Sequence, residues 1–269
     1  MNTSWPAWAL MWLLSVAVFA GCKGVSWWQA RKERGLKRGG WTLAYVLAWP
    51  GMDPRAFLGS QAPPRPSAWE WIWAGSKTLL GAGLFWGLAR HASAGGDLLM
   101  GWVGLVGLVL ALHFGSFHLL ALAWRRAGVD ARPLMEAPLE ASSLGDFWGR
   151  RWNTAFRDLV HAAVFQPLRP RIGIPCAVLA VFLVSGLVHD LVISLPAKAG
   201  YGGPTTYFLI QGAGTLLERS TAGKALGLGK GLAGRSVTLA VVALPLFWLF
   251  HPAFLRGVIL PMMHAWGAL

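Results

Sequence analysis

One histidine lies in the most apolar stretch of the chain. The run from Val184 to Asp190 ends in two ionisable residues, and an ionisable side chain inside a membrane helix is costly and therefore a candidate for function. In a helix, Ser185 and Gly186 precede His189 by four and three residues, so the three share a small, polar face. Such a face leaves room for a ligand or a water-lined tunnel. The alternative is that His189 only forms a hydrogen bond to another helix.

A second candidate site combines arginine with tryptophan. The segment DFWGRRWN at 146–153 places Arg150 and Arg151 between Trp148 and Trp152. Arginine recognises phosphate well, so the pair is a candidate entrance for an anionic substrate. The alternative is an interfacial anchor that faces anionic membrane lipid.

The other ionisable residues in apolar runs have simpler explanations. Glu70 and His251 lie near the ends of such runs, where a side chain reaches the interface, and Lys77 has a long aliphatic stem. His113 and His118 are five residues apart and lie on different faces of a helix, whereas metal-binding pairs are usually three or four apart. We therefore expect hydrogen bonds between helices here and no metal site.

The composition indicates a membrane protein. Of 269 residues, 55% are hydrophobic and only 13% are charged, the mean hydropathy is +0.49, and 17 residues are Trp. Ordinary soluble domains carry about 25% charged residues, and Trp is typical of membrane–water interfaces. The net charge of +13 is explained by cytoplasmic loops, because no nucleic-acid recognition motif accompanies it. Cys22 and Cys176 lie far apart and indicate neither a disulfide framework nor a metal site.

The pattern predicts an all-α, polytopic membrane bundle in one domain over 1–269, with re-entrant and amphipathic helices. The first apolar run is predicted to be a retained helix and not a signal peptide, because no Lys or Arg precedes it. Glycines at 101, 104 and 107 predict a close approach of two helices. About six spans are predicted, at 5–21, 68–89, 97–124, 173–196, 205–217 and 236–251.

The basic segments set the expected topology. Segments 23–40, 125–171 and 218–235 are rich in Lys and Arg, which predicts that they are cytoplasmic and that the N-terminus lies outside. All three lie on one side only if the run at 41–50 does not cross the membrane. This run has about ten residues, too few to span, so we predict a re-entrant or interfacial segment.

Two motifs together carry a family resemblance. The segment 146–153, followed some thirty residues later by FLVSGLVH at 182–189, resembles the plant-type wax synthase family of the membrane-bound O-acyltransferase superfamily. PLMEAP at 133–138 is similar to the family's lead-in. The stretch 207–218, with Gln211-Gly212, resembles its next helix, and 248–250 resembles its last. The resemblance covers about 133–254, whereas 1–124 supplies N-terminal spans that match only in hydropathy.

The resemblance implies a catalytic histidine in the membrane, assisted by the polar residue that ends the first motif. These are His189 and Asn153 here, with Asp190 where the family usually has Glu. Neutral imidazole is a natural base near pH 7 and contributes ~10²–10⁴ in rate, while Asn153 orients the hydroxyl or donates to the developing oxyanion. The expected reaction transfers an acyl group from the co-substrate acyl-CoA to a lipid-like alcohol, with no metal or other cofactor. Expected substrate-binding residues are Arg150, Arg151, Trp148, Trp152, Ser185 and Gly186.

Two other classes stay open. A Mg²⁺-dependent membrane lipid transferase would need clustered aspartates, but those of this chain are scattered. A transport-type or non-catalytic membrane protein is the other alternative, although the matched half-repeats of many transporters are missing. The Ala-, Gly- and Arg-rich composition favours a bacterial inner membrane over the endoplasmic reticulum. Acyl chain length, the alcohol and the oligomeric state are left open.

Overall fold

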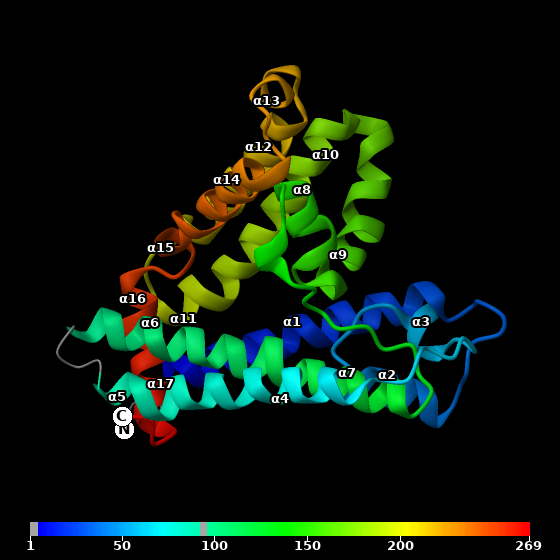
Figure 1. Ribbon diagram of the computed structural model, residues 1–269, viewed down its shortest axis with the longest axis horizontal. Helices are drawn as coiled ribbons and strands as arrows, with labels where there is room; N and C mark the ends of the chain where they lie inside the picture. The colour runs from blue at the N-terminus through cyan, green and yellow to red at the C-terminus, as the bar shows by residue number, and fades with distance from the viewer. Residues whose placement is uncertain (1–4, 92–95) are drawn as a thin grey trace. The chain divides into compact units, whose positions relative to one another are not determined.

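The computed structural model describes residues 5–91 and 96–269, and in these residues it contains helices and no strand (Figure 1). Four helical stretches are long and apolar enough to cross a membrane: 7–30, 96–126, 154–197 and 231–249. The prediction of an all-α membrane protein is therefore confirmed.

The chain divides into two compact units. The first unit contains the residues up to 18, 137–152 and 160–266, and the second contains 19–136, 153–159 and 267–269. Helix α1 (Ala7–Ala30) contributes to both units, as does α9 (Thr154–Val160). Both units draw on segments far apart in the sequence. The prediction of a single domain over 1–269 stays a prediction.

In the second unit, two long helical stretches lie side by side because glycine lets their backbones approach. The first consists of α4 (Ala68–Ala82), the π-helical η1 (Gly83–Leu88) and α5 (Ala89–His91). The second consists of α6 (Gly96–Val109), the π-helical η3 (Leu110–Ser116) and α7 (Phe117–Arg126), and Figure 1 shows the two together. A Cβ atom on Gly107 would lie 2.8 Å from the carbonyl oxygen of Gly81. The close approach predicted from the glycines is confirmed.

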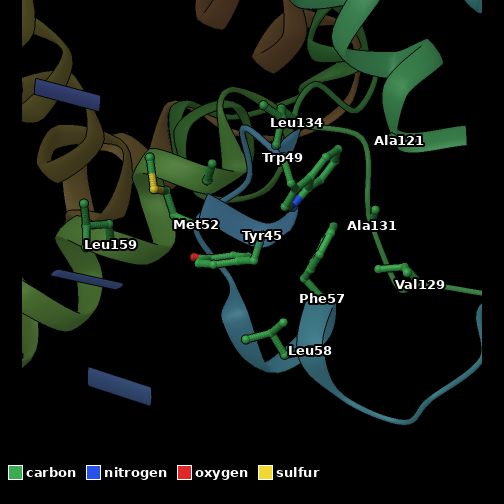
Figure 2. Close-up of a cluster of buried hydrophobic side chains, with 11 residues drawn as sticks. Tyr45, Trp49, Met52, Phe57, Leu58, Ala121, Val129, Ala131, Leu134 and Leu159 are labelled. Atoms are coloured by element: carbon green, nitrogen blue, oxygen red, sulfur yellow. The ribbon is translucent and has the colours of Figure 1, made fainter. Parts of the chain in front are cut away.

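An aromatic core fills the rest of the second unit. Helix α2 (Gly40–Ala48) and the short α3 (Pro54–Leu58) place Tyr45, Trp49 and Phe57 together, and all three are buried (Figure 2). The rings of Trp49 and Phe57 are stacked with their centroids 6.1 Å apart, and Trp124 meets Phe57 edge-on at 5.0 Å. Helix α2 has nine residues, far short of a span.

The first unit is built on α10 (Gln166–His189), which packs along α12 (Gly203–Arg219). Gly173 interrupts α10 with φ 77°, a conformation that favours glycine, and the predicted span begins at this residue. The remaining elements of the unit are η4 (Pro138–Glu140), α8 (Leu144–Asp146), η5 (Phe147–Arg151), η6 (His161–Phe165), η7 (Asp190–Ser194), α11 (Leu195–Ala197), α13 (Thr221–Ala225), α14 (Gly231–Ala243), α15 (Leu246–Leu249), α16 (Pro252–Phe254), η8 (Leu255–Ile259) and α17 (Leu260–Ala265).

Two details of the predicted map need correction. Helix α1 does not end near Gly21 but continues to Ala30. Lys23 can lie within this helix because its side chain is buried among partners. Its Nζ donates to the carbonyl oxygen of Gly51 and lies 3.4 Å from the centroid of the Tyr45 ring. The number of helices suited to crossing is four within the described residues, where about six were expected. Helix α12 has only 17 residues, and α4 carries three Trp together with Glu70 and Lys77, which makes it less apolar.

Candidate active site

His189 ends α10, and one ring nitrogen is fixed by the helix itself. Its Nδ1 lies 2.7 Å from the carbonyl oxygen of Ser185, one turn earlier. A carbonyl oxygen only accepts, so Nδ1 carries the proton and donates. In the neutral ring, Nε2 then keeps its lone pair, and it has no hydrogen-bond partner among the described residues. This is the protonation pattern that a general base needs.

Aromatic side chains from three elements gather beside His189. The ring of Phe208 on α12 lies 4.5 Å from the His189 ring, centroid to centroid, and Trp148 from the π-helical η5 lies 5.6 Å from Phe208. Phe182, two turns before His189 on α10, meets Trp148 edge-on at 6.0 Å. The two sequence motifs therefore meet directly through Trp148 and Phe182, and Phe208 contacts both Trp148 and His189.

Gln211 ties this aromatic group to α14. It is fully buried, its Oε1 accepts from Trp148 Nε1 at 3.3 Å, and its Nε2 donates to the carbonyl oxygen of Val241 at 2.8 Å. Sequence reasoning assigned no site role to Gln211 or Phe208. The sequence pattern that could have indicated them is the spacing of residues 208, 211, 212 and 215, which places these residues on one face of a helix.

Gly186 brings α10 close to α12, whereas Ser185 bonds within α10. The Ser185 hydroxyl donates to the carbonyl oxygen of Val181 at 2.9 Å. A Cβ atom on Gly186 would lie 2.5 Å from the Cα atom of Thr205, so only glycine fits here without movement. The small face that was expected to leave room for a ligand is occupied at Gly186 by the α12 backbone. The substrate-binding role of the two residues stays a prediction.

Asp190 holds the turn between α10 and α12. Its Oδ1 accepts from Ser194 Oγ at 2.8 Å and from the backbone N–H of Gly202 at 2.9 Å. Its Oδ2 accepts from the backbone N–H of Thr205 at 3.1 Å and from the Thr205 hydroxyl. These four contacts fix the start of α12, and thereby the position of Phe208 beside His189.

The arginine pair is bound to one carboxylate. Nε of Arg150 donates to Asp146 Oδ1 and Nε of Arg151 donates to Oδ2, both at 2.8 Å. Burial alone would raise the pKa of Asp146, but Arg151 and Arg150 together lower it. Arg151 also donates to the carbonyl oxygen of Ala137, whereas the Arg150 side chain is 75% exposed. The guanidinium of Arg150 is thus more accessible to an anion than that of Arg151.

The two flanking tryptophans differ in position. Trp148 points its indole N–H toward Gln211, as described, whereas the Trp152 ring is stacked on Phe147 with centroids 5.4 Å apart. Both are partly buried. Trp148 contacts Phe208 and Phe182 directly, whereas Trp152 meets Trp148 edge-on with centroids 6.4 Å apart.

Asn153 belongs to the second unit and caps a helix there. Its Oδ1 accepts from the backbone N–H of Phe156 at 3.3 Å, in the first turn of α9. Its φ is 43°, a left-handed value that Asn tolerates better than most residues. The capping function was missed in the sequence, although Asn before a helix is a known N-terminal signal. The cooperation of Asn153 with His189 stays a prediction.

His118 and His251 form bonds that support the fold, and neither is a candidate for catalysis. Lys77 Nζ on α4 donates to His118 Nδ1 on α7 at 2.9 Å, which confirms the expected bond between helices, whereas His113 Nδ1 is buried without a partner among the described residues. His251 does not reach the interface as expected. It is buried, and its Nδ1 accepts from the backbone N–H of Phe254 at 3.1 Å, which caps α16.

No group of three or more His, Cys, Asp or Glu side chains is placed to hold a metal ion within 5–91 and 96–269. That no metal takes part stays a prediction.

A family model, the membrane bound O-acyl transferase family, matches residues 131–210, which include Trp148, Asn153, His189 and Phe208. Over these residues the chain is similar to the membrane bound O-acyl transferase family. It is 30% identical over 174 residues to the probable long-chain-alcohol O-fatty-acyltransferase 3 of Arabidopsis thaliana, covering 56% of this chain and 51% of the relative.

Two further relatives that are similar to this chain also come from plants. The long-chain-alcohol O-fatty-acyltransferase of Simmondsia chinensis is 32% identical over 142 residues, covering 48% of this chain and 40% of the relative. The acyl-CoA–sterol O-acyltransferase 1 of Arabidopsis thaliana is 30% identical over 145 residues, with the same coverage. The chain thus spans about half the length of these relatives or less. Their plant origin gives no support to the expected bacterial inner membrane.

Proposed function

We propose that this protein is a membrane-bound acyltransferase that moves an acyl group from acyl-CoA to the hydroxyl of a lipid-like alcohol. The observation that carries the proposal is the His189–Ser185 hydrogen bond, which leaves Nε2 of a histidine in an apolar helix available as a base. The relatives, which are named as acyltransferases of long-chain alcohols and of a sterol, support the reaction class.

In the proposed reaction, His189 Nε2 takes the proton of the alcohol as its oxygen attacks the thioester carbonyl carbon. The new C–O bond forms, the C–S bond breaks, and the thiolate of CoA takes up the proton from the imidazolium. Atoms and charges balance without a covalent acyl-enzyme. Nδ1 stays bonded to the Ser185 carbonyl oxygen throughout, which stabilises the cationic ring as it forms.

Asn153 is proposed to stabilise the oxyanion of the tetrahedral intermediate. Its Oδ1 is occupied by the cap of α9, so the amide donor Nδ2 is the group assigned to this task.

Binding of the donor is assigned to the arginine pair. The exposed guanidinium of Arg150 is proposed to contact the phosphates of acyl-CoA, with Arg151 holding the segment in place. Acyl-CoA is the proposed co-substrate, with no further cofactor. A long-chain alcohol is the proposed acceptor, because two of the three relatives described above carry that name.

The proposal is tested by turnover in membranes that contain the full chain. Acyl-CoA is supplied with a saturated long-chain alcohol or, separately, with a sterol, and both free CoA and ester are measured. Alcohol-dependent CoA release with matching ester supports the proposal, and a preference for the sterol would change only the acceptor. Mg²⁺-dependent release of pyrophosphate from a prenyl diphosphate would contradict it in favour of a lipid transferase. A protein that is inserted and folded but has neither activity would favour a non-catalytic role.

A further inference from the structure

A cavity with a cationic lining lies where α1 ends, within the second unit. Its volume is about 330 Å³, and its lining includes Arg31, Lys37 and Arg38 together with apolar side chains such as Trp27 and Leu58. None of its lining residues is acidic. The cavity therefore combines positive charge with an apolar wall.

The positive charges of this cavity are not neutralised by the neighbouring carboxylate. Glu33 is the only acidic residue of segment 23–40, and both of its oxygens accept from Arg55, with Oε1 and Oε2 each 2.9 Å from Nε. No ion pair is described for Arg31, Lys37 or Arg38. An anionic ligand would thus meet cations that have no carboxylate partner within 5–91 and 96–269.

The surface around the cavity is suited to a membrane interface. The Arg31 guanidinium lies 4.8 Å from the Trp28 ring and Lys37 Nζ lies 4.6 Å from the Trp41 ring, and both rings are exposed. Helix α2 exposes Leu43 at 62% and Leu47 at 79%, one turn apart, while its opposite face is buried in the aromatic core. A nine-residue helix with one exposed apolar face is expected to lie in the plane of the interface.

We propose that this cavity is a binding site for the phosphate headgroup of an anionic phospholipid. Arg31, Lys37 and Arg38 contact the phosphate, and the exposed apolar face of α2 lies against the acyl chains of the same leaflet. The predicted cytoplasmic side of segment 23–40 fits, since the cytoplasmic leaflet is the one that carries anionic lipid. The site is independent of acyl transfer, and lipid binding is expected even in a protein without turnover.

The test is a lipid titration of the detergent-purified full chain, followed by native mass spectrometry. The probes are dioleoyl phosphatidylglycerol, dioleoyl phosphatidylcholine and palmitoyl-CoA. Arg31→Gln/Lys37→Gln removes two cations of the cavity, and the matched control Lys32→Gln/Arg34→Gln removes one Lys and one Arg of the same loop outside the cavity. Thr42→Trp keeps every charge but places a large side chain in the cavity, because Thr42 lines it.

The expected result is preferential binding of phosphatidylglycerol over phosphatidylcholine, weakened about tenfold or more in the double cavity variant. Thr42→Trp should weaken it as well, and the control should not. Equal weakening in the cavity variant and its control, or no effect of Thr42→Trp, would show diffuse attraction and overturn the site. Loss of palmitoyl-CoA binding with phosphatidylglycerol binding unchanged would assign the cavity to the donor and overturn the lipid proposal. Melting curves of each variant exclude misfolding as the cause.

Discussion

Nδ1 of His189 lies 2.7 Å from the carbonyl oxygen of Ser185, so the helix that carries the histidine also sets its tautomer. The bond orients the ring about its Cα–Cβ axis and keeps Nε2 on the side away from the backbone. The Phe208 ring on α12 packs against the His189 ring, with their centroids 4.5 Å apart, and restricts its movement. Any variant that moves α12 relative to α10 is therefore expected to affect the reaction without touching His189.

Gly186→Ala tests this dependence on helix separation. The new Cβ atom would lie 2.5 Å from the Cα atom of Thr205. Neither atom can move by rotation of a side chain, so α12 must shift. We expect a loss of about 1–3 kcal/mol in the free energy of unfolding, measured by denaturant in detergent, and a lower kcat. Gly83→Ala is the control, since open space surrounds that helical glycine. Equal stability of the two variants would contradict the described α10–α12 contact.

Asn153→Asp separates the capping role of Asn153 from its proposed catalytic role. Aspartate caps a helix about as well as asparagine, so the fold of α9 should be kept. It lacks the amide donor Nδ2 and adds a negative charge at the residue proposed to stabilise the oxyanion, so on that proposal kcat should fall by about 10²-fold or more. Full activity in a stable Asn153→Asp protein would contradict the catalytic role and show that Asn153 only caps α9.

The two arginines should behave differently when each is replaced with alanine. Arg150→Ala removes an exposed guanidinium, and if this group contacts the donor phosphates, the KM for acyl-CoA should rise about tenfold or more. Arg151→Ala removes contacts to Asp146 and to the Ala137 carbonyl oxygen, so it should mainly lower stability. Steady-state kinetics and melting curves of both variants make the comparison. A normal donor KM for Arg150→Ala, with less protein in the membrane, would indicate a lipid anchor.

The depressed pKa of Asp146 predicts how stability depends on pH. Arg151 and Arg150 lower this pKa in the folded state, so the carboxylate stabilises the fold fully above the ordinary Asp value of about 3.9. This contribution is lost as the pH falls through the lower folded-state pKa. Asp146→Asn should cost ~1–3 kcal/mol at neutral pH, and its deficit should shrink below pH ~4. Thermal melts of both proteins across this range provide the measurement, and a constant difference would contradict the ion pairs.

Much of the fold follows from apolar runs and small residues. The glycines at 101, 104 and 107 indicated the close approach to α4, and the Lys77–His118 bond fits the expected link between helices. Arg150 lies four residues after Asp146, a helical ion-pair spacing that could have been recognised. Arg151 lies five residues after it and reaches the same carboxylate from a π-helical segment, which the sequence pattern does not indicate.

Other features depend on contacts between distant segments. Asp190 stood out only as the neighbour of His189, yet its partners Gly202 and Thr205 follow after a turn whose course is set by tertiary structure. From the sequence, Lys23 is the first residue of a basic loop. In the fold its Nζ is buried, where it donates to the carbonyl oxygen of Gly51 and lies over the Tyr45 ring. Such partners cannot be found from local periodicity, because helix patterns describe one face of one element at a time.

The most direct measurement is ester formation by His189→Asn, compared with the wild type and with His118→Ala. The asparagine amide can still donate to the Ser185 carbonyl oxygen, but it has no basic nitrogen at the position of Nε2. We predict that kcat falls ~10²-fold or more while the KM for acyl-CoA changes little. His118→Ala should keep most of its activity, because the bond of His118 to Lys77 is a structural link between helices. Substantial turnover by folded His189→Asn protein would contradict the assignment of His189 as the general base.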